Sequence, residues 1–246
     1  MIATRNKIQK AAAVLAGVVG HSNTVRIGAG RIYNDLLIKN SPIRSISQLD
    51  YLGQNISVSF ENFFSVDGNV TLPELVFIAT LARIKAPKRV VEIGTFDGNT
   101  TLQLAVNTPD DTEIYTLDLP IGLDTSPGVD GQDARYIVSD LRVQRRFLNT
   151  RFHNRIRQCY GDSLLYDFAQ FAEGGKPDFI FIDAGHSYEC VRNDTEKSLE
   201  ILAPGGTIVW QDFGSSWPGV YQYLAELSGR LNLLHIEETS LVVYQS

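Results

Sequence analysis

Acidic side chains follow several short apolar runs in this sequence, at the points where strands would give way to loops. Asp118, Asp183 and Asp212 each stand within two residues of the end of such a run, and His186 follows Asp183 by three residues. In a parallel sheet the carboxyl ends of the strands meet at one edge, where ligands bind in folds of this kind. We therefore expect these side chains at one edge of a sheet. Carboxylates there could accept hydrogen bonds from hydroxyl groups or hold a divalent metal ion, and an imidazole could accept a proton.

A glycine-rich turn follows an earlier apolar run, residues 89–93. It reads Gly94-Thr-Phe-Asp-Gly98, and its glycines allow a tight turn and a close approach of the backbone to a ligand. Because Phe96 replaces the second glycine, the pattern differs from the G-x-G-x-x-G of nicotinamide enzymes, and no Gly-Lys-Ser/Thr of a phosphate-binding loop follows. An acid inside the strand, Glu92, suits a cofactor without a pyrophosphate. Asp118, one strand further on, is placed to accept hydrogen bonds from ribose hydroxyls.

Short β-rich runs alternate with helical patterns from residue 71 onward, which is typical of a parallel sheet covered by helices on both faces. The end of the chain predicts two strands, 231–236 and 241–244, whose short connection makes them an antiparallel hairpin. The fold class is therefore α/β, with a doubly wound, mostly parallel sheet and an antiparallel C-terminal hairpin strand. The other predicted strands are 89–93, 113–117, 155–159, 179–182 and 207–210, and the predicted helices are 71–86, 100–106, 134–148, 163–171 and 187–202.

Residues 1–70 show weaker patterns than the rest and contain two helical fragments, 2–19 and 31–38. The apolar stretch 11–20 is rich in Ala and Gly, and no small-x-small cleavage site follows it, so a packing helix is favoured over a secretory signal. We therefore expect a helical and irregular N-terminal extension over residues 1–70 and a second domain over residues 71–246.

The composition argues against several functional classes. With 43% hydrophobic residues the chain of 246 residues can bury a sizeable core, and no apolar run approaches the ~20 residues that cross a bilayer. The formal net charge of −6 argues against a nucleic-acid binder, which normally carries a basic excess. Two cysteines, Cys159 and Cys190, suit neither a disulfide framework nor a zinc site, so a cytoplasmic location is expected.

Five segments follow one another along residues 71–246. They are Glu92-Ile-Gly-Thr-Phe-Asp-Gly-Asn-Thr100, Asp118, Gly161-Asp-Ser163, Phe181-Ile-Asp-Ala-Gly-His-Ser-Tyr188 and Leu202-Ala-Pro-Gly-Gly206. Together they resemble class I S-adenosylmethionine-dependent methyltransferases, and most of all the small-molecule O-methyltransferases of the caffeoyl-CoA, catechol and antibiotic sugar-tailoring type. The resemblance implies a Rossmann-like sheet of seven strands and methyl transfer to a small-molecule acceptor, most readily at a hydroxyl oxygen.

The resemblance also implies S-adenosylmethionine as the cofactor and assigns roles to the matching residues. The glycine-rich turn and Glu92 would line its methionine end, and Asp118 would take the ribose hydroxyls. Asp162 and Ser163 would flank the adenine, and Asp183 would lie where the methyl group is transferred. The predicted cofactor-binding residues are Glu92, Gly94, Thr95, Phe96, Gly98, Asn99, Thr100, Asp118, Leu119, Asp162, Ser163 and Asp183.

Methyl transfer to a hydroxyl also needs a group that removes the hydroxyl proton, and the sequence offers two devices. A divalent metal ion held by Asp183 and Asp212 would lower the pKa of the hydroxyl, and these oxygen ligands suggest Mg²⁺. Phe213 stands where catechol-type enzymes carry Asn or Asp as a third ligand, so that ligand would have to come from His186, from water or from a loop residue. Alternatively, His186 itself acts as the general base. The predicted catalytic residues are Asp183, His186 and Asp212, and the predicted metal ligands are Asp183 and Asp212.

The sequence leaves open whether the domain is active and what residues 1–70 contact. An inactive domain that binds S-adenosylmethionine, or that serves as a scaffold, is the alternative to an enzyme. The N-terminal extension could cover the acceptor site or build a contact between copies of a homo-oligomer. No contact with nucleic acid or a membrane is expected.

Arginines crowd the stretch 142–157, beginning with Arg142, Arg145 and Arg146. A solvated helix face is favoured for them over the docking of an anionic acceptor.

Overall fold

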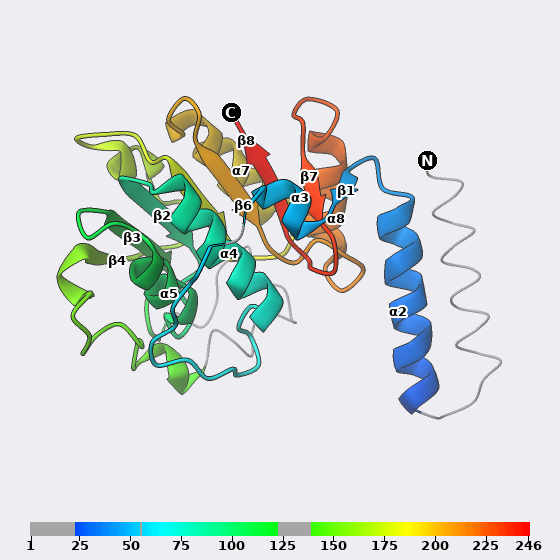
Figure 1. Cartoon of the computed structure of the whole chain (residues 1–246), viewed down its shortest axis with the longest axis horizontal. Coiled ribbons are helices and arrows are strands. Elements are labelled where there is room, and N and C mark those ends of the chain that lie inside the picture. The colour runs from blue at the N-terminus through cyan, green and yellow to red at the C-terminus, as the bar shows by residue number, and fades with distance from the viewer. Residues whose placement is uncertain (1–22, 55, 123–138) are drawn as a thin grey trace.

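An eight-stranded sheet forms the centre of the molecule, with the strand order β1-β7-β8-β6-β5-β2-β3-β4 (Figure 1). The computed structural model describes residues 23–54, 56–122 and 139–246 of the chain. The strands are β1 (Arg44–Ile46), β2 (Arg89–Ile93), β3 (Glu113–Asp118), β4 (Ile156–Tyr160), β5 (Phe179–Ile182), β6 (Thr207–Trp210), β7 (Leu234–Ile236) and β8 (Val242–Gln245). The α-helices are α2 (Asn23–Lys39), α3 (Gln48–Leu52), α4 (Leu72–Lys85), α5 (Asn99–Asn107), α7 (Tyr188–Ile201) and α8 (Pro218–Leu227), and the 3₁₀ helices are η1 (Asp140–Arg142), η2 (His153–Arg155) and η3 (Phe168–Ala172).

The middle of the sheet is parallel. β4, β3, β2, β5 and β6 run in one direction, and β8 runs antiparallel between β6 and β7. The predicted α/β class, with a mostly parallel sheet and an antiparallel hairpin strand near the C-terminus, is confirmed. β2, β5 and β6 have the predicted bounds, and the other predicted strands differ by one to three residues at an end.

β1 makes the sheet one strand wider than the predicted seven. It pairs parallel with β7, with Arg44 opposite Leu234 and Ile46 opposite Ile236. β1 is only three residues long and partly exposed, and it has no apolar alternation that would predict a strand. It forms because the otherwise open edge of β7 offers unpaired backbone groups. Part of the N-terminal region thus joins the sheet, and the division of the chain at residue 70 stays a prediction.

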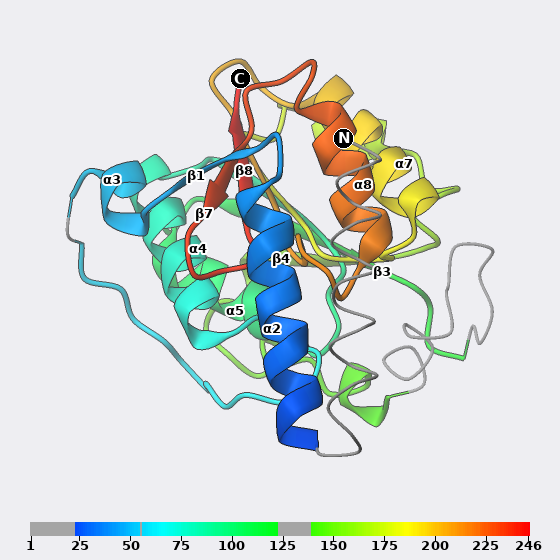
Figure 2. The same ribbon diagram turned by 90° about the vertical axis from the view of Figure 1, so that its right-hand side faces the viewer.

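Two hydrophobic clusters, one on each face of the sheet, hold the helices against it. On one face α4 and α5 pack through side chains such as Phe77 and Leu102, and on the other α7 and α8 pack through Val191 and Leu224. Figure 2 shows these helix pairs on opposite sides of the strands. The central strands are buried on both faces, which explains the unbroken apolar run Phe179–Ile182 of β5.

Two predicted helices are wrong in the described residues. The segment 163–171 contains turns and the 3₁₀ helix η3 except for its last residue but no α-helix, and the described part of 134–148 holds η1 and turns. In the first segment the side chains of Asp162 and Asp167 accept hydrogen bonds from backbone N–H groups two residues further on, which competes with helix formation. Residues 134–138 lie outside the described part of the chain.

Among residues 23–54, 56–122 and 139–246, every helix is too short or too polar to cross a membrane. The predicted helix 2–19 lies outside these residues.

Candidate active site

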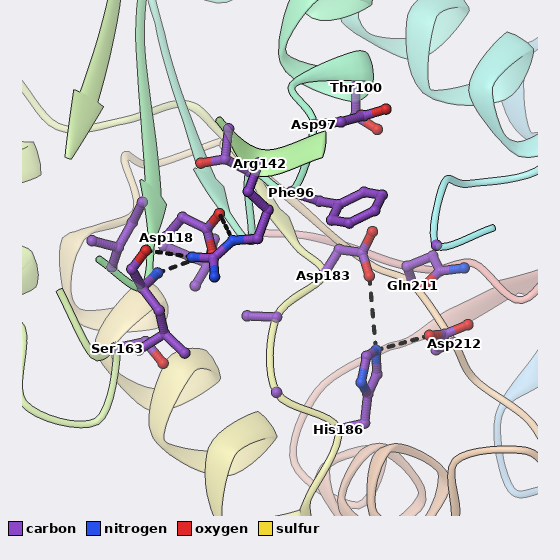
Figure 3. A pocket seen from close by; sticks show the side chains of 18 of the residues that line it. Phe96, Asp97, Thr100, Asp118, Arg142, Ser163, Asp183, His186, Gln211 and Asp212 are labelled. Atoms are coloured by element: carbon purple, nitrogen blue, oxygen red, sulfur yellow. Dashed lines mark hydrogen bonds and ion pairs between the residues drawn. The ribbon is translucent and has the colours of Figure 1, made fainter. Parts of the chain in front are cut away.

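A cavity of about 350 Å³ lies at the carboxyl ends of the parallel strands, between the turn after β2 and the loops that follow β3, β5 and β6 (Figure 3). Most of the predicted site residues line it, so the sheet brings them together as expected. Two of them, Glu92 and Gly98, do not line it. The predicted residues in its wall are Gly94, Thr95, Phe96, Asn99, Thr100, Asp118, Leu119, Asp162, Ser163, Asp183, His186 and Asp212.

The turn after β2 depends on two glycines in left-handed conformations. Gly94 has φ +104°, and a Cβ there would lie 1.8 Å from the carbonyl oxygen of Asp183, so only glycine allows β2 and β5 to end side by side. Gly98 has φ +77° and is the N-cap of α5, and a Cβ there would lie 2.8 Å from the Phe147 ring. Gly98 therefore serves the packing of the turn instead of forming part of the cavity wall.

Glu92 lies beneath this turn, fully buried inside the sheet. Its Oε2 accepts hydrogen bonds from the hydroxyls of Thr101 and Thr116, the latter at 2.5 Å. Burial raises the pKa of the Glu92 carboxyl to about 8, although both hydroxyls act in the opposite direction. Glu92 thus supports the turn from below and is largely protonated near neutral pH.

Asp118, at the end of β3, is held by two buried arginines. Its Oδ2 lies 2.7 Å from Arg145 Nη2 and 3.3 Å from Arg142 Nε, and its Oδ1 accepts a hydrogen bond from the Leu119 N–H at 2.9 Å. Arg142 and Arg145 are only 3% and 4% exposed, so the predicted solvated helix face is wrong for them. The reason is electrostatic, because a buried guanidinium needs an anionic partner and Asp118 supplies it. Arg142 lines the cavity and Arg145 does not.

Arg146 connects the loop before α4 to the start of α5. Its guanidinium pairs with buried Asp97 and donates hydrogen bonds to Asn69 and Asn99. It also lies over the Phe64 ring, 3.8 Å from the ring centroid. Arg146 thereby fixes the rim of the cavity near Asn69, and it is a further arginine of this stretch that faces inward.

Asp183, His186 and Asp212 form the other end of the cavity, as Figure 3 shows. The Nε2 atom of His186 lies 2.8 Å from Asp212 Oδ2 and 3.9 Å from Asp183 Oδ1. The imidazole stacks on the Trp217 ring with a centroid distance of 3.9 Å, which fixes its plane. Burial raises the pKa of Asp183 to about 6, the His186 contact lowers it, and the negative charge of Asp212 raises it further.

The backbone of Asp212 has an unusual conformation that two distant residues support. Its φ is +68°, a left-handed value that costs energy for a residue other than glycine. The Asp212 N–H donates to Ser240 Oγ at 3.1 Å, and Ser240 donates from its N–H and its hydroxyl to Glu74 Oε1 at 2.7 and 2.6 Å. Glu74 is 3% exposed. The sequence showed Glu74 only as an acid in the first turn of a helix, and nothing near Ser240 indicated a link to the site.

The three groups at this end of the cavity could also hold a metal ion. Asp183, His186 and Asp212 each offer one ligand atom, and these atoms lie within 4.8 Å of one another. Phe213, at the position where a third metal ligand was expected, has no ligand atom and is buried against the Tyr221 ring. The imidazole of His186 would therefore be the third ligand beside the two carboxylates. Two carboxylates with an imidazole suit Mn²⁺, Fe²⁺ or Zn²⁺ better than Mg²⁺, which prefers oxygen ligands.

Comparison with known proteins identifies the family. A sequence model of the family described as "Methyltransferase domain" matches residues 91–213, which are 123 of the 246 residues and include the whole cluster at Asp183. The chain belongs to this methyltransferase family. A second family model, described as "O-methyltransferase", matches residues 45–124. The predicted class and the prediction of a methyltransferase enzyme are therefore confirmed.

Solved structures show the same fold at low sequence identity. The O-methyltransferase TomG from Streptomyces achromogenes, solved with SAM, has a TM-score of 0.53 at 17% identity, over 88% of this chain and 98% of that chain. The SAH-bound methyltransferase PaMTH1 from Podospora anserina has a TM-score of 0.54 at 17% identity, over 93% and 97%. A putative caffeoyl-CoA O-methyltransferase from Staphylococcus aureus has a TM-score of 0.52 at 20% identity, over 72% and 85%. The search of curated proteins gave no match.

Proposed function

We propose that this methyltransferase transfers a methyl group from S-adenosylmethionine to a hydroxyl group of a small molecule. The observation that carries the proposal is a single cavity with two chemically different ends. One end holds Asp118, suited to hydroxyls of a nucleoside, and the other holds His186 between Asp183 and Asp212, suited to proton removal. The match to the O-methyltransferase family model and the donor bound in TomG support the same assignment.

Asp118 would bind the ribose of the donor, and the adenine would lie toward Asp162 and Ser163. Both oxygens of Asp118 already have partners, because Oδ1 accepts a hydrogen bond from the Leu119 N–H and Oδ2 pairs with Arg142 and Arg145. A ribose hydroxyl would therefore have to replace one of the two arginines at Oδ2. We expect Arg142, which lines the cavity, to give way, and Arg145, which lies outside the wall, to keep the carboxylate in place. The turn from Gly94 to Thr100 would surround the methionine end, with Glu92 and Gly98 acting on the shape of the turn from outside the wall.

The chain's own catalytic task is to hold the acceptor hydroxyl and to accept its proton. When bound, S-adenosylmethionine supplies a methyl group on a positively charged sulfur, which an oxygen nucleophile attacks in line. His186 is the residue placed to take the proton, because stacking on Trp217 fixes its ring; the acceptor hydroxyl would take the place at Nε2 that Asp212 Oδ2 now occupies at 2.8 Å. The carboxylates of Asp183 and Asp212 then stabilise the imidazolium that forms.

A metal ion is the other device that these residues fit. Asp183, His186 and Asp212 would hold it, and it would lower the pKa of the acceptor hydroxyl. A metal-bound His186 could not also accept the proton at the same nitrogen, so the two devices exclude each other. Transfer that persists in the presence of EDTA supports His186 as the base, and transfer that EDTA abolishes and Mn²⁺ restores contradicts it.

Calorimetry on the full chain tests the proposal. We expect S-adenosylmethionine to bind, NADH not to bind, and Asp118→Asn to weaken S-adenosylmethionine binding by about tenfold or more, because a ribose hydrogen bond to a charged acceptor is lost. Glu200→Gln, an exposed acid outside the cavity, is the matched control and should leave binding unchanged. Absence of S-adenosylmethionine binding in the wild type would refute the proposal.

A further inference from the structure

A second cavity, of about 850 Å³, adjoins the first at Asp212. The two cavities share Thr71, Asp212 and Trp217 in their walls. A molecule in the second cavity would therefore contact Asp212, the member of the cluster of Asp183, His186 and Asp212 that lines both cavities. Most of the rest of its wall comes from α2, from the loop after β6 and from the loop between β7 and β8, and Ser45, Glu74 and His235 complete it.

The α2 wall is attached to the loop that follows Asp212. Asn34 of α2 accepts a hydrogen bond from the Ser215 N–H at 2.8 Å, and the Tyr221 hydroxyl donates to the Leu37 carbonyl at 3.4 Å. The fit is close, because a Cβ at Gly214 would lie 2.7 Å from Asn34 Oδ1. Figure 2 shows α2 passing over the edge of the sheet that carries β7 and β8. The second cavity is thus bounded by a docked helix and lies beside the candidate active site.

The walls of the second cavity carry more acids than bases. Asp35, Glu237 and Glu238 line it together with Asp212, whereas its basic side chains are Arg31 and Lys39. The lining carboxyl of Glu74 is already used by Thr71 and Ser240.

His235, also in the wall, does not offset these acids. It is held by Ser45 and the Thr239 carbonyl, and burial lowers its pKa, so it adds no positive charge near neutral pH. Within the described residues, the carboxylates of Asp35, Glu237 and Glu238 form no ion pair or hydrogen bond that would neutralise them.

We propose that this second cavity binds the methyl acceptor, and that the acceptor class is a small hydroxylated molecule that carries a basic amine. This inference rests on the proposed function and adds the acceptor to it. The hydroxyl end of the acceptor would extend past Thr71, Asp212 and Trp217 into the first cavity, where His186 lies, while the ammonium group is attracted by the carboxylates of Glu237, Glu238 and Asp35. Acceptors that carry a carboxylate or phosphate are repelled by the same groups.

Two series of probes test this charge preference on the full chain loaded with S-adenosylhomocysteine. Dopamine, 4-methylcatechol and 3,4-dihydroxybenzoate share a catechol and differ in charge, and glucosamine, glucose and glucuronate do the same for a sugar. We expect the amine of at least one series to bind about tenfold more tightly than its acid, as measured by ligand-observed NMR titration. The double variant Glu237→Gln/Glu238→Gln should reduce this preference by about threefold to tenfold, and Glu200→Gln should not.

Each other result overturns the inference. Equal binding of amine and acid, a preference for the acid, a preference that the double variant leaves intact, or no binding by any probe would show that this cavity does not select a basic acceptor. Binding of S-adenosylhomocysteine, recorded first, separates this failure from that of the proposed function. If S-adenosylhomocysteine binds and no charge preference follows, only the acceptor inference fails, and if it does not bind, the proposed function fails.

Discussion

Replacing Glu92 by Gln tests the electrostatics beneath the candidate cofactor site. The Glu92 carboxyl is fully buried, and burial raises its pKa from 4.5 to about 8. In the unfolded chain the group regains its ordinary pKa. As pH rises from about 4.5 to about 8, the unfolded state therefore releases a proton that the folded state keeps. The free energy of unfolding falls with rising pH across this window and levels off above it.

The size of the effect follows from the two pKa values. They differ by about 3.5, which corresponds to about 5 kcal/mol over the whole window and to about 3 kcal/mol at pH 7. Gln has the shape of the protonated acid, keeps an acceptor oxygen for Thr101 and Thr116, and does not titrate. We therefore expect Glu92→Gln to match the wild type near pH 4 and to exceed its unfolding free energy by about 3 kcal/mol at pH 7 and about 5 kcal/mol at pH 9.

Urea denaturation of both proteins at several pH values measures this difference directly. Glu200→Gln is the control, since it makes the same substitution at an exposed side chain. A Glu92→Gln variant that is equally stable as or less stable than the wild type at pH 7 and pH 9 would mean that Glu92 is ionised in the folded protein. That result would refute the argument that burial outweighs the hydrogen bonds and the nearby charge of Arg145.

Three further predictions concern the walls of the site. Gly94→Ala should destabilise the protein by about 3 kcal/mol or more, because the new Cβ would lie 1.8 Å from the Asp183 carbonyl oxygen. An unchanged midpoint of thermal unfolding would contradict this expected loss of stability. Since the pKa of Asp183 is about 6, S-adenosylhomocysteine formation should slow as pH falls through 6, when the protonated acid no longer stabilises the imidazolium. Asp183→Asn should change the position or steepness of the acidic limb, whose remainder belongs to the base His186, and a profile of unchanged shape would contradict the role of Asp183. Ser240→Ala should lower kcat about tenfold, because the Ser240 hydroxyl accepts the hydrogen bond from the Asp212 N–H. It should leave the affinity for S-adenosylmethionine unchanged, because Ser240 does not line the first cavity. An unaltered kcat would show that other contacts hold Asp212 in its conformation.

The central strands and the two ends of the site could be predicted because their signals are local. Unbroken apolar runs such as Phe179–Ile182 identify strands buried on both faces. Once the strands are parallel, the residues after each one must meet at a single edge, which places Asp118, Asp183 and Asp212 around one cavity. The same reasoning puts His186 there, since it follows Asp183 by three residues.

The features that the sequence did not predict depend on partners far along the chain. Arg142 and Arg145 look like surface arginines until Asp118, more than twenty residues earlier, is brought beside them. β1 acquires its conformation from β7, which lies about 190 residues later. The support of Asp212 by Ser240 likewise appears only after the β7–β8 loop returns to the end of β6. No local pattern encodes such pairings, so they emerge only from the folded structure.

Transfer of a labelled methyl group tests the central claim most directly. The full chain is incubated with deuteriomethyl S-adenosylmethionine and the amine-bearing probes, and both products are followed by mass spectrometry. The proposed function predicts equal amounts of S-adenosylhomocysteine and of a probe that carries the deuteriomethyl group on oxygen, with a rate that falls steeply in His186→Ala. If S-adenosylmethionine binds but is returned unchanged with these and all other hydroxylated acceptors, the chain is a binding domain and the account of its catalysis is wrong.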